Sequence, residues 1–249
     1  MEKVYLILGA SSDLGIELIK NIIKSKSGCV ENIRMIAHYF SSCAEIQKIK
    51  DNNPEIKIDM INANLGDLED TRKLIERIKD LGCRLDYIVN FCACAYKFNR
   101  LSELDALRMN YDMTVQVYSF ALICQAFIPA MAESKFGKIV VMLSAATTNI
   151  PPKYTIEYTT VKYALLGLIK GIAVDYGEYG ININAVSPGM IETKFIKNIG
   201  RKVKEFTAEK NPRHRNLQIG DVVPTIMFLL SDESQFMNGT NINLSGIPD

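Results

Sequence analysis

The sequence has no tryptophan, only two histidines and almost no excess charge of either sign. His38 and His214 are far apart and the six cysteines form no CxxC pair, so no metal site is expected. The formal net charge is +1 over 249 residues, without any run of like charges. This balance gives no reason to expect nucleic acid or an anionic membrane as a partner.

Long hydrophobic runs are also scarce. The uncharged stretch 4–12 is too short to span a bilayer and carries a glycine turn instead of a signal-peptide cleavage site. The longer stretch 113–131 contains Gln116, Gln125 and Pro129, which favours a buried core helix over a membrane span. The cysteines fit buried, reduced thiols, so a cytoplasmic protein is expected.

Apolar patterning predicts strands alternating with helices along the whole chain. The expected strands are 4–8, 33–39, 56–61, 86–90, 138–144, 181–186 and 240–244. The expected helices are about 14–23, 44–50, 67–81, 104–133, 156–178, 191–210 and 221–230. No linker interrupts them, which predicts one doubly wound α/β domain over residues 1–249. Its sheet is expected to be mostly parallel and seven-stranded, with helices on both faces.

Unusual residues stand where the predicted strands end. Gly9 follows the first strand, and Asn90 and Ser144 close the fourth and fifth. Pro188-Gly189 follows the sixth. Because ligands of such sheets bind beyond the carboxyl ends of the strands, one shared site is predicted at this edge.

The segment LGASSDLG, residues 8–15, joins the first strand to the first helix. Gly9 and Gly15 would let backbone N–H groups and the helix N-terminus approach a pyrophosphate. Asp13 replaces an expected glycine. We expect its carboxylate to cap the helix that begins at Leu14 and to point away from the phosphates. Taken alone, the turn fits a plain structural corner equally well.

Tyr158 and Lys162 are four residues apart on one face of a predicted helix. A nearby ammonium favours the phenolate, so we expect Lys162 to lower the pKa of Tyr158. The phenol would then serve as a general acid for a carbonyl oxygen. A solvated helix edge is the alternative for this pair alone. Tyr154 lacks a lysine four residues on, because residue 158 is tyrosine.

Together these segments resemble the short-chain dehydrogenase/reductase family of the single-domain type, over essentially the whole chain. LGASSDLG resembles its TGxxxGxG turn, with Leu8 and Asp13 as departures. LDYIVNFCA resembles LDILVNNAG, but has Phe91 and Ala93 in place of Asn and Gly. MNYDMTV, GKIVVMLSAA, YTTVK and NAVSPGMIET resemble four further family segments. The nearest overall resemblance is to 3-oxoacyl-[acyl-carrier-protein] reductases.

The resemblance implies a Rossmann-type oxidoreductase. It assigns proton transfer to Tyr158, support of that tyrosine and of the nicotinamide ribose to Lys162, and orientation of the carbonyl to Ser144. Asn110 would hold a water that relays protons to Lys162. The residues expected to line the cofactor are Gly9, Ser11, Ser12, Asp13, Leu14, Gly15, His38, Ser41, Ser42, Asn64, Leu65, Asn90, Cys92, Tyr158, Lys162, Pro188, Gly189, Ile191 and Thr193.

The segment IAHYFSS, at the end of the second predicted strand, has no acidic residue. An acid at this point binds the adenosine ribose, and its absence leaves room for a 2′-phosphate. NADP(H) is therefore favoured, with His38, Ser41 and Ser42 as phosphate ligands, and NAD(H) is the alternative. The two serines equally suit the cap of the next helix.

The substrate is expected to be a ketone, with a β-ketoacyl thioester preferred. Alternatives are a sugar or polyol, or a dinucleotide-sensing protein without turnover. The lysines of segment 190–212 suit an acidic substrate or a solvated helix face. Helices 104–133 and 156–178 have continuous apolar faces, and the resemblance implies that they pair in a homodimer or homotetramer.

Overall fold

The computed structural model describes residues 2–25, 32–95 and 97–247. Its strands are β1 (Lys3–Leu8), β2 (Ile33–Tyr39), β3 (Lys57–Asn62), β4 (Tyr87–Asn90), β5 (Gly137–Met142), β6 (Ile181–Pro188) and β7 (Asn241–Leu244). Its α-helices are α1 (Asp13–Ser25), α2 (Ala44–Asn52), α3 (Leu68–Lys79), α4 (Ala106–Met113), α5 (Ser119–Glu133), α6 (Ile156–Tyr176), α7 (Arg201–Lys210) and α8 (Ile219–Leu230). Each lies close to a segment that the apolar pattern predicts.

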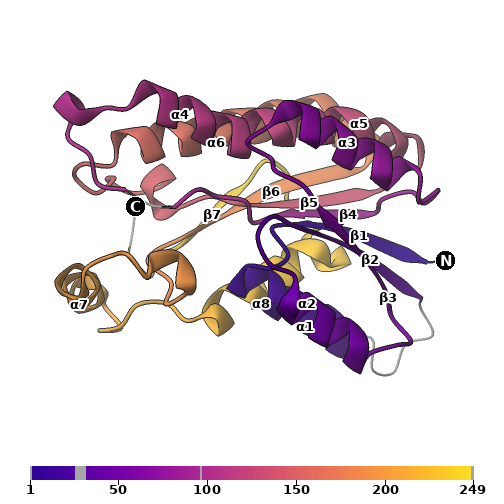
Figure 1. Ribbon diagram of the computed structural model, residues 1–249, viewed down its shortest axis with the longest axis horizontal. Helices are drawn as coiled ribbons and strands as arrows, with labels where there is room; N and C mark the ends of the chain where they lie inside the picture. The colour runs from indigo at the N-terminus through magenta and orange to yellow at the C-terminus, as the bar shows by residue number, and fades with distance from the viewer. Residues whose placement is uncertain (1, 26–31, 96, 248–249) are drawn as a thin grey trace.

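The seven strands form one sheet in the order β3-β2-β1-β4-β5-β6-β7, and every neighbouring pair is parallel. Helices α3, α4, α5 and α6 cover one face, while α1, α2 and α8 cover the other (Figure 1). A separate apolar core fills each interface between sheet and helices. The predicted doubly wound parallel sheet is confirmed.

A continuous helical run spans residues 106–133, because a π-helical turn (Thr114–Tyr118) joins α4 to α5. Among the described residues, it is the one helix long and apolar enough to cross a membrane by length and composition. Half of its most apolar window is buried, and Phe120, Ile123 and Phe127 belong to the core above the sheet. Core packing therefore accounts for its apolar character, as the sequence analysis expects.

The predicted helix 191–210 is confirmed only in its second half, as α7, and its first half is wrong. Ile191 forms a β-bridge with Leu217, a short 3₁₀ helix spans Lys194–Ile196, and α7 begins only after Gly200. We call residues 190–217, between β6 and α8, the lid segment. The tertiary bridge at Ile191 keeps the first residues extended, in place of the helix that the pattern predicts there.

Candidate active site

Because all strands of the sheet are parallel, their carboxyl ends lie along one edge, and several predicted site residues stand at these ends. The turn 9–12 follows β1, and Asn90 is the last residue of β4. Pro188 is the last residue of β6. β5 ends at Met142, two residues earlier than predicted, and Ser144 starts a 3₁₀ turn. The Ser144 hydroxyl oxygen accepts the Ala146 N–H at 3.2 Å, which stabilises this turn in place of a longer strand.

Lys162 is buried between α6 and the sheet, with 1% of its surface exposed. Its Nζ donates a hydrogen bond to the Met142 carbonyl at 3.0 Å, at the end of β5. Burial lowers the pKa of Lys162 to about 8. Lys162 Nζ lies 5.8 Å from the centre of the Tyr158 ring, so the two side chains converge from one helix face.

Tyr158 hydrogen bonds with the Ser144 side chain, which brings the predicted tyrosine and serine together. Burial raises the pKa of the phenol, and the bond to Ser144 acts in the opposite direction but is weaker. The pKa of Tyr158 is therefore raised, not lowered by Lys162 as the sequence analysis expects. The physical reason is that burial disfavours the charged phenolate by more than the hydrogen bond to Ser144 favours it. Tyr158 is thus a protonated acid at neutral pH.

Asn110 belongs to α4. It lies on the exposed surface of α4, and its carbonyl accepts the Thr114 hydroxyl at 2.9 Å. Gln116, in the π-helical turn that packs on α6, is 2% exposed instead. Its Oε1 is buried without a hydrogen-bond partner in the described structure. In the sequence Gln116 counts only against a membrane span, and the signal for a buried polar site is a polar residue inside an apolar helix.

The turn after β1 has the geometry of an anion site. Gly9 has φ of +72°, a conformation that other residues rarely adopt. A Cβ on Gly15 would lie 2.6 Å from the Ala10 carbonyl oxygen, so only glycine lets α1 pack against the turn. The first N–H groups of a helix lack intrahelical acceptors, and α1 begins directly after this turn, at the carboxyl end of β1.

Asp13 does not cap α1, contrary to expectation. Ser12 does so, because its hydroxyl oxygen accepts the Gly15 N–H at 3.1 Å. The Asp13 carboxylate instead accepts the backbone N–H of Lys194, at 2.7 Å, from the lid segment. The carboxylate therefore points away from the turn, as expected from the sequence. Its partner, however, lies in a segment that no local sequence pattern indicates.

His38 is not available as a phosphate ligand, because it is 2% exposed. Its Nδ1 accepts the Gly9 N–H at 3.2 Å, and its Nε2 lies 3.1 Å from the Ala63 carbonyl oxygen. This pairing needs a neutral ring with the proton on Nε2, and burial lowers the pKa of His38. His38 thus links the ends of β1, β2 and β3. Ser41 and Ser42 are exposed near the start of α2.

The remaining predicted cofactor residues hold the loops at the same edge. Asn64 Oδ1 accepts the Gly66 N–H at 3.0 Å, and Asn90 Oδ1 accepts the Cys92 N–H at 2.9 Å. Burial raises the pKa of the Cys92 thiol to about 12, so it stays protonated at neutral pH. Leu65 and Ile191 are buried, whereas Ser11, Leu14, Gly189 and Thr193 are partly exposed.

These features fit a dinucleotide. The open helix N-terminus suits a pyrophosphate, and the glycines leave no side chain between it and the backbone. The hydroxyls of Ser144 and Tyr158 and the Lys162 ammonium meet at the end of β5, at the same edge of the sheet as this turn and with β4 between the two strands. A phenol that can donate a proton, placed at the same edge as a dinucleotide site, suits the transfer of a hydride and a proton to a carbonyl group.

Comparison with models of known protein families shows to which family the chain belongs. A family model described as Enoyl-(Acyl carrier protein) reductase matches residues 28–246. The chain belongs to the short-chain dehydrogenase/reductase family. Within that family it is 24% identical over 246 residues to Dehydrogenase/reductase SDR family member 4 of Rattus norvegicus, covering 98% of this chain and 86% of the relative. It is 27% identical over 248 residues to the 3-oxoacyl-[acyl-carrier-protein] reductase FabG of Buchnera aphidicola, covering 98% and 96%.

Solved structures share the fold. Levodione reductase superposes with a TM-score of 0.87 at 23% identity, covering 98% of this chain and 96% of that one. ElxO with NADP bound gives a TM-score of 0.83 at 24% identity, covering 99% and 98%. At these identities the likeness establishes the architecture, and this chain is an oxidoreductase of the family.

Proposed function

We propose that the protein is an NADP(H)-dependent reductase that converts a ketone into a secondary alcohol, as a single catalytic unit over residues 1–249. The observation that carries the proposal is the hydrogen-bonded pair Tyr158–Ser144 beside the buried Lys162, at the same edge of the sheet as the glycine turn. A bound nicotinamide would supply the hydride. The protein residues then need only orient the carbonyl and deliver a proton.

Tyr158 is the proton donor in this proposal. Its raised pKa keeps the phenol protonated at neutral pH, which suits reduction. Ser144 donates a hydrogen bond to the carbonyl oxygen and orients it. Lys162 uses one N–H for Met142 and keeps two for the cofactor ribose and a relay water. With a pKa of about 8, Lys162 exchanges protons readily near neutral pH.

We assign the relay water to Gln116 in place of Asn110. A buried amide oxygen without a protein partner is a site where an ordered water is expected. The π-helical turn that holds Gln116 packs against α6, the helix of Lys162. Irregular turns of this kind are frequent at functional sites.

The preference for NADP(H) rests on the end of β2. The four residues from Tyr39 to Ser42 carry no carboxylate, which leaves the adenosine ribose side open to a 2′-phosphate. Ser41 and Ser42 remain the proposed phosphate ligands, without His38. An NADP-bound structure within the same fold supports this choice, and NAD(H) is the alternative.

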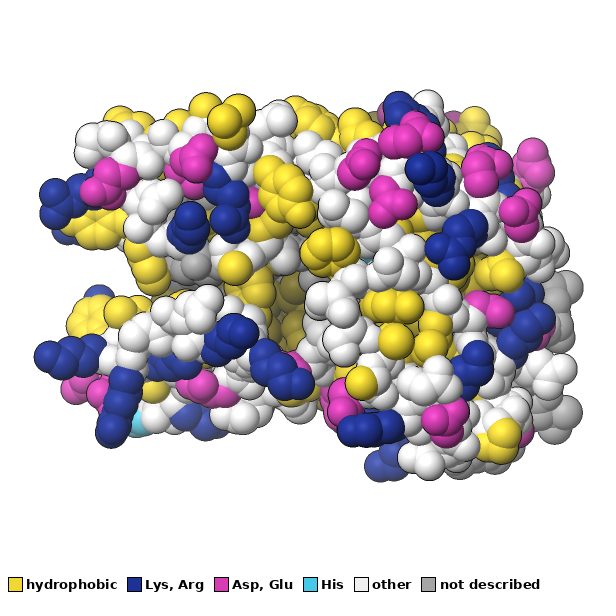
Figure 2. Space-filling model, viewed as in Figure 1, with side chains coloured by type: hydrophobic (Ala, Val, Ile, Leu, Met, Phe, Trp, Pro, Cys, Tyr) yellow, Lys and Arg dark blue, Asp and Glu magenta, His cyan; other side chains and the backbone are white. Residues whose placement is uncertain are grey.

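A β-ketoacyl thioester is the proposed substrate. Figure 2 shows the molecule hollowed between the α4 end of the upper layer and the α7 end of the lower layer, with Lys and Arg side chains on both rims. In the lid segment, Lys197, Arg201 and Lys202 are exposed. A phosphate-bearing carrier arm would meet these cations while its ketone reaches Tyr158.

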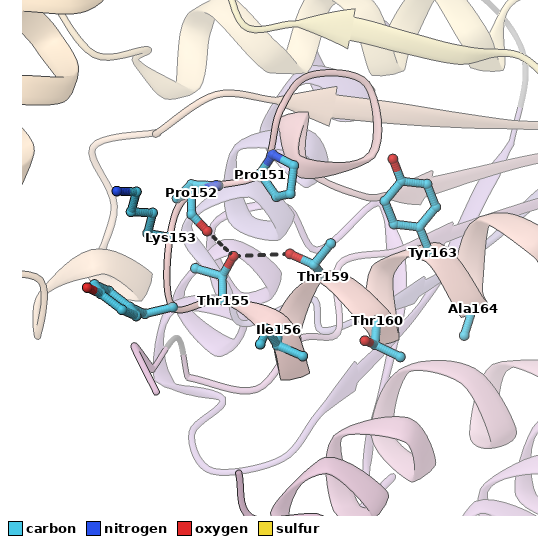
Figure 3. A pocket seen from close by; sticks show the side chains of 10 residues that line it. Pro151, Pro152, Lys153, Thr155, Ile156, Thr159, Thr160, Tyr163 and Ala164 are labelled. Atoms are coloured by element: carbon cyan, nitrogen blue, oxygen red, sulfur yellow. Dashed lines mark hydrogen bonds between the residues drawn. The ribbon is translucent and has the colours of Figure 1, made fainter. Parts of the chain in front are cut away.

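We further propose that the protein forms a homodimer or homotetramer in the cytoplasm. Leu107 on α4 and Val174 on α6 are 85% and 82% exposed, which is unusual for large aliphatic side chains. A groove of about 650 Å³ lies along α6 and includes the half-exposed Ile156 and Tyr163 (Figure 3). A second copy would cover these surfaces, and light scattering that shows only monomers would contradict this.

All described cysteines are free thiols, which suits a reducing compartment such as the cytoplasm; Cys29 lies outside the described residues.

The test is consumption of NADPH and of NADH by the purified protein with acetoacetyl-CoA as substrate. We expect oxidation of NADPH, faster than that of NADH. Binding of NADPH without oxidation would contradict the thioester and direct the search to sugars and other ketones. Binding of neither dinucleotide would contradict the enzyme proposal itself.

A further inference from the structure

The Asp13 carboxylate connects two segments that are 181 residues apart in the sequence. Its Oδ2 accepts the Lys194 backbone N–H at 2.7 Å, and its Oδ1 lies 3.5 Å from Lys194 Nζ. Lys194 begins the 3₁₀ helix of the lid segment, and the preceding Thr193 makes no side-chain bond to that helix. Asp13 therefore provides, from α1, the cap that this short helix lacks locally.

At its start the lid segment is held by Ile191, which belongs to the apolar core on the α1 and α8 face of the sheet, and Ile196 of its 3₁₀ helix is also buried. Its base is closed within itself, since Leu217 N–H donates to the Met190 carbonyl at 2.9 Å and Glu192 N–H donates to the Leu217 carbonyl at 2.9 Å. Its later part is tied to the C-terminal loop, where Asn211 Nδ2 donates to the Ser245 carbonyl at 2.8 Å. The contact with Asp13 ties its first helix to the turn after β1.

The two parts of the contact differ in strength. The Lys194 side chain is 83% exposed, so its ion pair with Asp13 is screened by water and weak. The Asp13 side chain is only 20% exposed, and its bond to the Lys194 N–H joins a carboxylate to a helix N-terminus. Removing the Asp13 carboxylate should therefore weaken the attachment of the lid segment more than removing the Lys194 ammonium.

The position of the contact links the lid to the dinucleotide turn. Asp13 is the first residue of α1, directly beside the N–H groups proposed for the pyrophosphate. A free carboxylate there would repel a phosphate, whereas one held by Lys194 is turned away and partly neutralised. The same residue thus removes a repulsion and fixes the lid over the edge of the sheet.

We propose that Asp13 is a positioning residue that latches the lid segment onto the dinucleotide turn and thereby slows the release of bound dinucleotide. The latch rests on the proposed dinucleotide binding. The first helix of the lid lifts only after the bond between Asp13 and Lys194 breaks. Dinucleotide release then follows the opening of this contact.

The experiment compares wild type with Asp13→Ala, Asp13→Asn and Lys194→Ala. Amide hydrogen exchange of residues 193–199 is measured without dinucleotide, and the NADPH dissociation rate is measured by stopped-flow fluorescence with excess NADP⁺ as chase. Asp13→Ala should accelerate both about tenfold, because the charge-assisted bond is lost. Lys194→Ala keeps the backbone N–H and should change both less than about threefold. Asp13→Asn keeps an acceptor oxygen and should fall between them.

The outcomes separate the latch from the proposed function. Unchanged exchange in Asp13→Ala would overturn the latch, whatever the variant does to NADPH binding. Slower NADPH release from Asp13→Ala would also overturn it, because charge repulsion by Asp13 would then dominate. Faster exchange in a protein that binds neither NADPH nor NADH would refute the proposed function, and with it the effect on release, while keeping the structural anchor.

Discussion

Gly15 offers a direct test of the turn geometry through its substitution by alanine. A Cβ at this position would lie 2.6 Å from the Ala10 carbonyl oxygen and 2.8 Å from its carbon, and backbone atoms cannot rotate away. Gly220 is the matched control, because it is also in the first turn of a helix and a Cβ there meets nothing within 4 Å. Both variants gain a similar helix propensity, at most about 1 kcal/mol. Their difference in unfolding free energy isolates the clash, which costs about 1–3 kcal/mol.

Thermal unfolding at matched protein concentration measures this difference. For a chain of this length, 1 kcal/mol shifts Tm by about 2–4 °C, so Gly15→Ala should melt roughly 2–12 °C below Gly220→Ala. It should also bind NADPH more weakly, because the N-terminus of α1 has to move. Equal melting temperatures would refute the close packing of α1 on the turn.

Two further predictions concern buried polar residues. Burial lowers the pKa of His38 below the ordinary 6.5, so the unfolded chain binds a proton that the folded chain does not, and stability should fall as pH drops through 6.5. Urea unfolding between pH 7.5 and 5.5 should show this fall in stability in wild type but not in His38→Leu. The variant should be about 1–3 kcal/mol less stable at pH 7.5, because Gly9 and Ala63 lose their hydrogen-bond partner. An equal pH dependence in both proteins would argue against a buried neutral ring. Gln116→Leu should slow turnover without lowering Tm, because it removes an unpaired buried oxygen. Asn110→Ala should leave the rate unchanged in the same steady-state assay, and the reverse pattern would return the relay to Asn110.

The sequence predicts the sheet well because its signals are local. Strands of a parallel sheet are short β-branched runs, and their order and handedness follow from the alternation with helices. The motif residues at the strand ends therefore fall on one edge without any knowledge of packing. Ser144 reaches the site for this reason, whereas Tyr158 and Lys162 reach it from one face of α6, which their four-residue spacing predicts.

The errors concern contacts that no local pattern encodes. Asp13 meets a partner 181 residues away, so its capping preference is overridden by tertiary structure. His38 is a plausible phosphate ligand by composition, but its register in β2 points it into the sheet between Gly9 and Ala63. The sign of the Tyr158 pKa depends on burial, which spacing to Lys162 does not report.

The central claim is that Tyr158 is the proton donor of a dinucleotide-dependent reductase. The most direct measurement compares NADPH oxidation with acetoacetyl-CoA by Tyr158→Phe and by Tyr154→Phe, whose target is 50% exposed and outside the site. The account predicts that Tyr158→Phe binds NADPH like wild type but loses about 10²–10⁴-fold in kcat/KM, while Tyr154→Phe keeps full activity. Turnover that survives in Tyr158→Phe would contradict the account.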